Sequence, residues 1–347
     1  MADDGLDAFI VSYAPNIRYL TGFSGSAATV LLAHHETVLF TDFRYRDQVE
    51  EEVGGSVQAE IVQRDVVGHV FDRASARGCR TLGYEAHIIS ADEARRWGER
   101  EGPRELEPRV DWVETLRSSK DGDEVSSIRT AATLASSALE VTLERVAVGM
   151  REIDVAVILE SELRRRGSEW HPFETIVASG PRAALPHART TERVIGRGEW
   201  LLIDFGARVD GYCADITRTF VVGGKPDDRQ RAMYELVQNA QQSALKGIRA
   251  GMTGEDADAL ARRVIETRGF GDSFGHSLGH GLGLEVHEAP RVAKSNPRPL
   301  PDAAVVTIEP GVYFPGWGGV RLEDDVYLTA SGAELLSDGK TQLREIV

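Results

Sequence analysis

Four carboxylates and one histidine lie on or beside short apolar runs in the second half of the chain. A carboxylate in a buried strand needs a compensating charge, and two carboxylates in one poorly hydrated site raise each other's pKa unless a cation lies between them. A donor set rich in oxygen with one imidazole suits two divalent ions, with Mn²⁺ favoured and Co²⁺, Fe²⁺ or Zn²⁺ as alternatives. The candidate metal ligands are Asp204, Asp215, His280, Glu309 and Glu323.

The first two carboxylates belong to a predicted β-hairpin. The run Trp200–Phe205 and the run Tyr212–Phe220 are separated by an Asp210-Gly211 turn signal. A five-residue loop over 207–211 would place Asp204 opposite residue 214, one position from Asp215, so a bulge or a different turn is needed to align the two aspartates. A solvated hairpin with exposed aspartates is the alternative for this pair alone.

The histidine lies in a glycine-rich segment from Gly275 to Pro290 that carries three histidines. Glycines allow the backbone to approach a ligand closely. The segment lacks the Gly-x-Gly-x-x-Gly spacing of a dinucleotide fold. It also lacks a zinc-protease His-Glu-x-x-His motif, because Arg291 stands where the second histidine would be and Pro290 would break the helix. Glu309 and Glu323 follow apolar runs further on and are expected on strands.

Two different domains are expected to carry these residues. Residues 1–117 alternate apolar runs at Ala8–Val11, Ala28–Leu32 and Thr37–Phe40 with helical patterns, which predicts a small α/β domain. Helices are predicted from Asp42, over Val66–Ala76, and after a Ser90–Glu93 capping box. A charged stretch ends near Glu124, and a long helical pattern resumes at Val125, so the catalytic domain is placed at 118–347.

The second domain contains a weak internal repeat at an offset of 102 residues. Gly149-Met150 aligns with Gly251-Met252, Asp154 with Asp256, and Gly167 with Gly269. The sequence pattern of each copy predicts a helix, a Gly-Met turn and a second helix, followed by strands. Two unrelated helical hairpins are the alternative, since glycine is common at helix ends. If the duplication is real, a site between the copies would take ligands from both.

Composition excludes several classes of protein. The 347 residues contain 40 Lys and Arg against 55 Asp and Glu, a formal charge of −15 that disfavours nucleic acid as a partner. We found no signal peptide and no apolar run of the length of a membrane span. The two cysteines, Cys79 and Cys213, form no C-x-x-C motif. These features predict a cytoplasmic protein that binds neither nucleic acid nor membranes.

Taken together, the motifs resemble those of the Xaa-Pro peptidases, aminopeptidase P and prolidase, in the pita-bread metallopeptidase superfamily. The resemblance rests on Ile203–Phe220, the Gly-His-Gly-Leu-Gly-x-x-x-His-Glu-x-Pro run, Glu309-Pro-Gly and Arg321-x-Glu323. It extends to the N-terminal domain through Asn16–Gly25. It implies an α/β fold in which a small creatinase-like N-terminal domain precedes a pseudo-twofold pita-bread catalytic domain, and it implies a homodimer.

The resemblance also implies roles for the site residues. Asp204 is similar to a ligand of one metal, Asp215 and Glu323 to the bridging carboxylates, and His280 with Glu309 to the other ligands of the second metal. In the implied hydrolysis of the bond before proline, Glu309 accepts a proton. The other residues with an implied catalytic role contact substrate or support a ligand carboxylate, and they are His187, His287 and Arg321.

The substrate length stays open between two members of the family. Aminopeptidase P removes the first residue of longer Xaa-Pro peptides, whereas prolidase cleaves Xaa-Pro dipeptides. The compact chain and the brief loop at 181–184 favour the aminopeptidase, acting on small peptides with proline at the second position. A methionine aminopeptidase is disfavoured by the N-terminal domain. A non-catalytic binding protein on the same fold remains the alternative from another class, although such proteins typically lose metal ligands.

Overall fold

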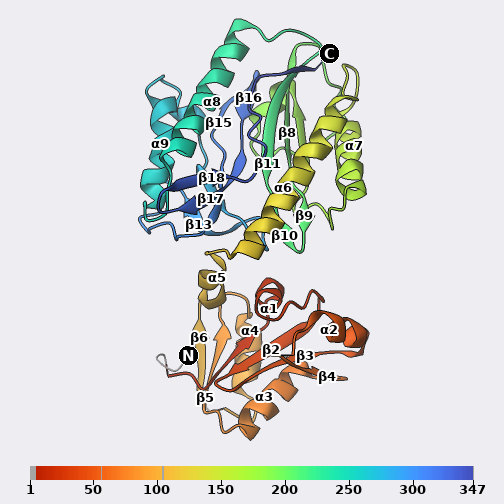
Figure 1. Cartoon of the computed structure of the whole chain (residues 1–347), viewed down its shortest axis with the longest axis vertical. Helices are drawn as coiled ribbons and strands as arrows, with labels where there is room; N and C mark the ends of the chain where they lie inside the picture. Colours follow the sequence, from red (N-terminus) through yellow and green to blue (C-terminus); the bar gives the residue numbers. More distant parts are fainter. Residues whose placement is uncertain (1–4, 56, 104, 347) are drawn as a thin grey trace. The chain divides into compact units, whose positions relative to one another are not determined.

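The computed structural model describes residues 5–55, 57–103 and 105–346, which form two compact units divided between Arg117 and Ser118. In the first unit the described strands form one mixed sheet in the order β4-β3-β2-β1-β5-β6 (Figure 1). The strands are β1 (Ala8–Val11), β2 (Ala28–Ala33), β3 (Glu36–Thr41), β4 (Gln58–Ile61), β5 (Thr81–Glu85) and β6 (Glu105–Arg109).

Helices cover both faces of this sheet, which explains why β1 is apolar at every position. Ile10 packs with Phe71 and Trp97 of α3 and α4, whereas Phe9 packs with Ile17 and Val113 of α1 and α5. A strand buried on both faces reads as a continuous apolar run. The helices are α1 (Ala14–Thr21), α2 (Arg46–Glu52), α3 (Val66–Ala76), α4 (Ala91–Gly98) and α5 (Trp112–Arg117).

The local predictions for this unit are confirmed with small changes at the ends of elements. The capping box is present, with Ser90 accepting from the Glu93 amide and Glu93 accepting from the Ser90 amide. The helix expected from Asp42 begins as a 3₁₀ turn, Phe43–Tyr45, before α2. Asp42 caps that turn by accepting from the Arg44 amide, which is why the sequence signal lies ahead of the α-helix.

The second unit contains two pairs of helices that flank its strands. Figure 1 shows α6 (Gly122–Leu143) and α7 (Glu152–Arg165) on one side, and α8 (Asp228–Gly247) with α9 (Gly254–Glu266) on the other. The prediction that the first of these helices starts at Val125 is wrong by three residues. Asp121 caps α6 and forms a capping box with Glu124, so the end of the charged stretch expected before the helix forms its N-cap and first turn.

The internal repeat of 102 residues corresponds to these helix pairs. Helix α7 starts at Glu152 and α9 starts at Gly254, which are 102 positions apart. The four repeated glycines lie at helix ends with positive φ, at +94° and +83° for Gly149 and Gly251 and at +103° and +82° for Gly167 and Gly269. Only glycine adopts this conformation without strain, so the repeat is visible in sequence mainly at these positions.

Each helix pair packs on one sheet, and the core under α8 and α9 also takes in Trp200, Leu202 and Val221 from the sheet under α6 and α7. Helices α6 and α7 share a core with the sheet β19-β11-β8-β7, and α8 and α9 share one with the sheet β13-β12-β14-β17-β18. The first sheet contains β7 (Ile176–Ser179), β8 (Glu199–Phe205), β11 (Ile216–Val222) and β19 (Glu345–Ile346). The second contains β12 (Gly279–Gly281), β13 (Glu288–Val292), β14 (Val305–Ile308), β17 (Asp324–Thr329) and β18 (Gly332–Leu335). Two short two-stranded sheets lie beside them. One pairs β9 (Arg208–Val209) with β10 (Tyr212–Cys213), and the other pairs β15 (Gly311–Phe314) with β16 (Gly318–Arg321).

A bridge between Thr217 and Glu323 joins the two halves of this unit, with the Glu323 amide donating to the Thr217 carbonyl at 3.1 Å. Thr217 belongs to β11 of the first half, and Glu323 immediately precedes β17 of the second. None of the helices in the described residues has the length and apolar character needed to cross a membrane.

Candidate metal centre and active site

Asp204 and Asp215 are brought together by the hairpin in the first half of the catalytic unit. Asp204 pairs with Thr217, not with residue 214, so the register expected from a five-residue loop is wrong. The turn is a tight two-residue one at Asp210 and Gly211, which have φ of 49° and 79° and leave Val209 opposite Tyr212. This turn shifts the register and makes Asp215 a diagonal neighbour of Asp204 without a bulge.

The glycines around His280 let three backbone segments meet. A Cβ atom at Gly279 would lie 1.9 Å from the Thr307 carbonyl oxygen, and one at Gly281 would lie 2.2 Å from that of Ala289. Any side chain at either position would push β12 away from its neighbours β14 and β13. The glycines are therefore required for this packing, which holds His280 in the wall of a cavity.

Side chains from the two halves converge on this point. The His280 Nε2 atom lies 3.7 Å from Asp215 Oδ2 and 3.5 Å from Glu309 Oε1. Asp215, His280 and Glu323 each offer one ligand atom, and these atoms all lie within 4.8 Å of one another. Thr217 Oγ1 donates to Glu323 Oε2 at 2.6 Å, which fixes that carboxylate at the bridge between the halves.

The carboxylates of this cluster lie close together in a buried site that holds too little positive charge to balance them, and this shifts their pKa values. Burial, and then the charge of Asp204, raises the pKa of Glu323 to about 8. Burial and the charge of Glu323 also raise the pKa of both Asp215 and Glu309. Burial lowers the pKa of His280 to about 4, so its imidazole is neutral near pH 7, as a metal ligand must be.

Two buried oxygens in this group lack a hydrogen-bond partner among the described residues, namely Asp204 Oδ1 and Asp215 Oδ1. An unsatisfied buried carboxylate oxygen is costly, and a cation would satisfy it directly. Four carboxylates and one neutral imidazole match the donor preference of divalent ions in oxygen-rich sites. The residues present therefore fit a metal centre.

A guanidinium and a phenol support the cluster from outside. Arg321 donates through Nη2 to Asp204 Oδ2 and through Nε to Thr217 Oγ1 at 3.0 Å. Its Nη1 atom donates to the Tyr313 hydroxyl at 3.0 Å, and that hydroxyl lies 2.9 Å from His276 Nε2. Arg321 is 3% exposed, so its positive charge acts on the acids with little screening by water.

All eight residues singled out from the sequence line one cavity of about 920 Å³. They are the five candidate ligands together with Arg321, His187 and His287. Sequence reasoning missed further residues in its wall. His276 lies in the glycine-rich segment four positions before His280, and nothing in its spacing sets it apart. Arg291 is the cross-strand partner of His280, which only the sheet register reveals, and Arg189 follows His187 by two positions.

Another carboxylate was also missed. The Asp325 Oδ2 atom accepts from the Asp215 amide at 3.1 Å, and Asp325 is fully buried. Burial raises the pKa of its carboxyl well above the usual range. It holds the backbone of a candidate ligand, and its position directly after Glu323-Asp324 on β17 offered no sequence signal for that contact.

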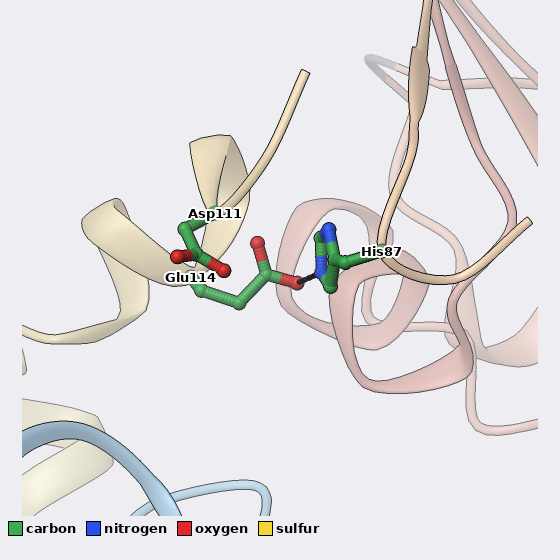
Figure 2. A group of neighbouring side chains, drawn as sticks. All are labelled: His87, Asp111 and Glu114. Atoms are coloured by element: carbon green, nitrogen blue, oxygen red, sulfur yellow. Dashed lines mark hydrogen bonds and ion pairs between the residues drawn. The ribbon is translucent and has the colours of Figure 1, made fainter. Parts of the chain in front are cut away.

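A second group of potential metal ligands lies in the N-terminal unit. Figure 2 shows Glu114 pointing toward the ring of His87, with Asp111 beside it, and Glu114 Oε1 lies 3.0 Å from His87 Nε2. The same oxygen accepts from Asn16 Nδ2 at 2.6 Å. His87 and Asp111 are exposed. These hydrogen bonds give Glu114 a local role in joining α1, α5 and the segment after β5.

Comparison with known proteins agrees with this architecture. Residues 126–330 match the model of metallopeptidase family M24, and residues 1–119 match that of the creatinase/prolidase N-terminal domain. The chain is 34% identical to a Xaa-Pro dipeptidase of Pyrococcus furiosus, covering 99% of this chain and 97% of that protein.

Solved structures match over the same span. A Xaa-Pro dipeptidase from Bacillus anthracis superposes with a TM-score of 0.95 at 37% identity, covering 99% of this chain and 96% of that one. An X-Pro aminopeptidase from Thermotoga maritima superposes with a TM-score of 0.93 at 36% identity, covering 99% and 98%. The α/β N-terminal domain and the pita-bread catalytic domain expected from the sequence are thereby confirmed. The chain belongs to metallopeptidase family M24, with a creatinase/prolidase N-terminal domain.

Proposed function

We propose that this protein is a Xaa-Pro dipeptidase with a dinuclear metal centre. The relatives named as Xaa-Pro dipeptidases support the dipeptidase over the aminopeptidase that the sequence favoured. We place the N-terminal domain at 1–117 and the catalytic domain at 118–347. The substrate is a small peptide with proline at its second position, and the chain acts as a homodimer, which light scattering of the purified protein tests.

Five residues hold two divalent ions in this proposal, with Mn²⁺ preferred. Asp204 would hold one ion, His280 and Glu309 would hold the other, and Asp215 and Glu323 would serve both. The unpartnered oxygens of Asp204 and Asp215 and the raised pKa of Glu323 support this assignment. When bound, the ions acidify a water molecule and polarise the peptide carbonyl.

The side chains around the ions then carry out defined steps. Glu309 accepts the proton of the attacking water and passes it to the leaving proline nitrogen. His287 and His187, which are exposed in the cavity wall, donate hydrogen bonds to the oxygen that becomes negative. Arg321 holds Asp204 in place and reduces the repulsion among the acids.

The observation that carries the dipeptidase assignment is a pair of guanidiniums on the cavity wall. Arg189 and Arg291 line the cavity together with the candidate ligands, and among the described residues neither side chain forms an ion pair or hydrogen bond. A dipeptide carries its free carboxylate on the proline, one residue from the scissile bond. Arginine binds carboxylates in a planar, bidentate way, so these two residues can select a substrate that ends at proline.

Replacing Arg291 by glutamine should raise KM for a Xaa-Pro dipeptide by roughly 10-fold to 100-fold, the value of a hydrogen bond to a charged group. The matched substrate is the same dipeptide with a C-terminal amide, for which the variant and the parent should have equal KM. Arg189→Gln tests the second guanidinium in the same way. Equal KM increases for the acid and the amide would show that neither arginine reads the carboxylate.

An aminopeptidase is the second candidate, because the cavity of about 920 Å³ exceeds what a dipeptide fills and the Thermotoga structure is named an X-Pro aminopeptidase. Assays of Xaa-Pro dipeptides and Xaa-Pro-Xaa tripeptides with added Mn²⁺, Co²⁺ or Zn²⁺ separate the two. We expect a higher kcat/KM for dipeptides. Better cleavage of tripeptides would establish the aminopeptidase, and no cleavage of either would favour a binding protein.

His287→Ala should lower kcat by roughly 100-fold to 1,000-fold, because it removes a donor to the developing negative charge. Metal content should stay near that of the parent, since the ring of His287 contacts the ring of His280 at 4.3 Å between centroids but is not one of the proposed ligands. Atomic absorption and steady-state kinetics on one preparation give both values. Loss of metal from this variant would make His287 a ligand and contradict the assignment.

A further inference from the structure

A buried ion pair links the start of α6 to the glycine-rich segment of the active site. Lys120 Nζ donates to Glu288 Oε1 at 2.7 Å, and the two side chains are 1% and 5% exposed. Lysine and glutamate are rarely buried this deeply unless they are paired. The Lys120 amide also donates to the Ala303 carbonyl at 2.8 Å, so the lysine is fixed at its backbone as well as at its charged end.

The carboxylate of Glu288 in turn closes the 283–288 turn. Its Oε2 atom accepts from the Glu285 amide at 3.4 Å. A Cβ atom at Gly283 would lie 2.4 Å from Oε1, so the carboxylate sits against the backbone of Gly283. The last glycine of the Gly-x-Gly-x-Gly run is therefore needed to make room for Glu288, and the Gly283 carbonyl is held from its other side by the Cys213 amide at 2.8 Å.

His287 lies inside this turn, directly before Glu288. Its imidazole forms no hydrogen bond with a described residue, and its ring packs only edge-on against His280. Its place in the cavity is therefore set by the backbone between residues 285 and 288, a segment that the hydrogen bond from the Glu285 amide to the Glu288 carboxylate closes into a turn.

We propose that Lys120 is a positioning residue for His287 and acts through Glu288. The inference rests on the proposed catalytic role of His287. Without Lys120, the Glu288 carboxylate would lose the cation that lies 2.7 Å from its Oε1 atom, and its hold on the backbone at Gly283 and Glu285 would weaken. A displacement of about 1 Å at a reacting group costs up to roughly 100-fold in rate.

A double-mutant cycle tests the proposal. Lys120→Met should lower kcat by roughly 100-fold at unchanged metal content, and Lys120→Arg should recover part of that loss because it restores the charge. In a His287→Ala background, Lys120→Met should lower kcat by less than about 3-fold, since the group it positions is already absent. An equal loss in both backgrounds would overturn the proposal.

Two additions separate positioning from general loss of stability. Leu159→Ala, in the core of α7, provides a control that lowers the melting temperature without touching the turn, and its kcat should be unchanged. If Lys120→Met fails to fold, the pair Lys120→Met with Glu288→Gln removes both charges of this ion pair and should show the same loss of kcat and the same cycle.

A structural measurement tests the positioning role of Lys120 independently of the proposed peptidase activity. In protein labelled with ¹⁵N-histidine and free of metal, His287 should give one sharp ring signal that broadens or splits in Lys120→Met and sharpens again in Lys120→Arg. An unchanged signal in Lys120→Met would contradict the proposal even if no peptide is cleaved. Absence of Xaa-Pro hydrolysis by the parent protein, with the signal behaving as expected, would instead remove only the proposed function.

Discussion

Glu323→Gln is expected to abolish Xaa-Pro hydrolysis and, at the same time, to stabilise the metal-free protein. The side chain is 2% exposed and faces other acids, and these surroundings raise its pKa to about 8. Glutamine has the same shape and can still accept the hydrogen bond from Thr217 Oγ1. It cannot supply the negative charge that holds two cations, so turnover should fall by about 1,000-fold or more.

The opposite signs of the two effects make this variant informative. Metal stoichiometry and kcat should both collapse, while the melting temperature in the presence of a chelator should rise by several degrees at pH 7, because one buried acid no longer has to be neutralised on folding. Glu334→Gln is the matched control and should change neither, because Glu334 lies on β18, the strand paired with the β17 that follows Glu323, and its side chain is 59% exposed. Retained metal and turnover in Glu323→Gln would contradict the bridging role.

The parts of this protein that could be predicted from sequence are those determined by nearby residues. Val66–Ala76 and the Ser90–Glu93 capping box follow from hydrophobic periodicity and a local hydrogen bond, and the structure has both as expected. The 102-residue repeat was detectable because left-handed backbone at helix ends requires glycine. Side chains elsewhere in the two halves have different neighbours, so few other positions of the two copies carry the same residue.

Predictions that depended on pairing between segments were less successful. The register expected for the hairpin carrying Asp204 differs by three positions from the observed one, because the Asp210-Gly211 signal gives the position of the turn but not its length. Register is set by turn geometry together with the buried face, and both aspartates interrupt that face. Positive φ at both Asp210 and Gly211 is typical of a two-residue hairpin turn, and assuming it gives the register that the structure has.

The missed site residues belong to the same class of problem. In the sequence Arg291 only marks the absence of a zinc-protease motif, whereas in the structure it pairs across the strands with His280. Asp325 holds the Asp215 amide across 110 residues of chain. Lys120 and Glu288 are separated by 168 residues. Contacts over such distances are created by the fold, and a single sequence contains no local signal for them.

The metal-free protein is expected to lose stability as the pH rises from 6.5 to 8, and Mn²⁺ should reverse that loss. Glu323 has a pKa raised from 4.5 to about 8 in the folded state, so its contribution is fully present below pH 4.5 and is lost as the pH rises through 8. The pKa values of Asp215 and Glu309 are raised for the same reasons, burial and neighbouring carboxylates, and act in the same direction.

The histidines fix the lower limit of this pH window. Burial lowers the pKa of His276 and of His280 from 6.5 to about 4, so their contribution is present above pH 6.5 and is lost only as the pH falls toward 4. Between pH 4 and 6.5 the acids and the histidines oppose each other. Above pH 6.5 the histidine contribution is constant, and the trend reports the buried acids alone.

Thermal unfolding in a chelator at pH 6.5, 7.25 and 8 measures the effect, and Mn²⁺ at about 100 times its Kd should then add about 2.7 kcal/mol, or roughly 5–10 °C for a domain of this size. At one fixed Mn²⁺ concentration the gain should be larger at pH 8 than at pH 6.5, because binding at pH 8 has fewer protons to displace from the ligands and the apparent Kd is lower. Glu323→Gln provides the internal control, since it removes one of the buried acids with a raised pKa and should make the fall in stability between pH 6.5 and 8 less steep. A metal-free protein whose stability is constant or rises between pH 6.5 and 8 would mean that these acids are already compensated by Arg321 and that the cluster does not need a cation to be stable.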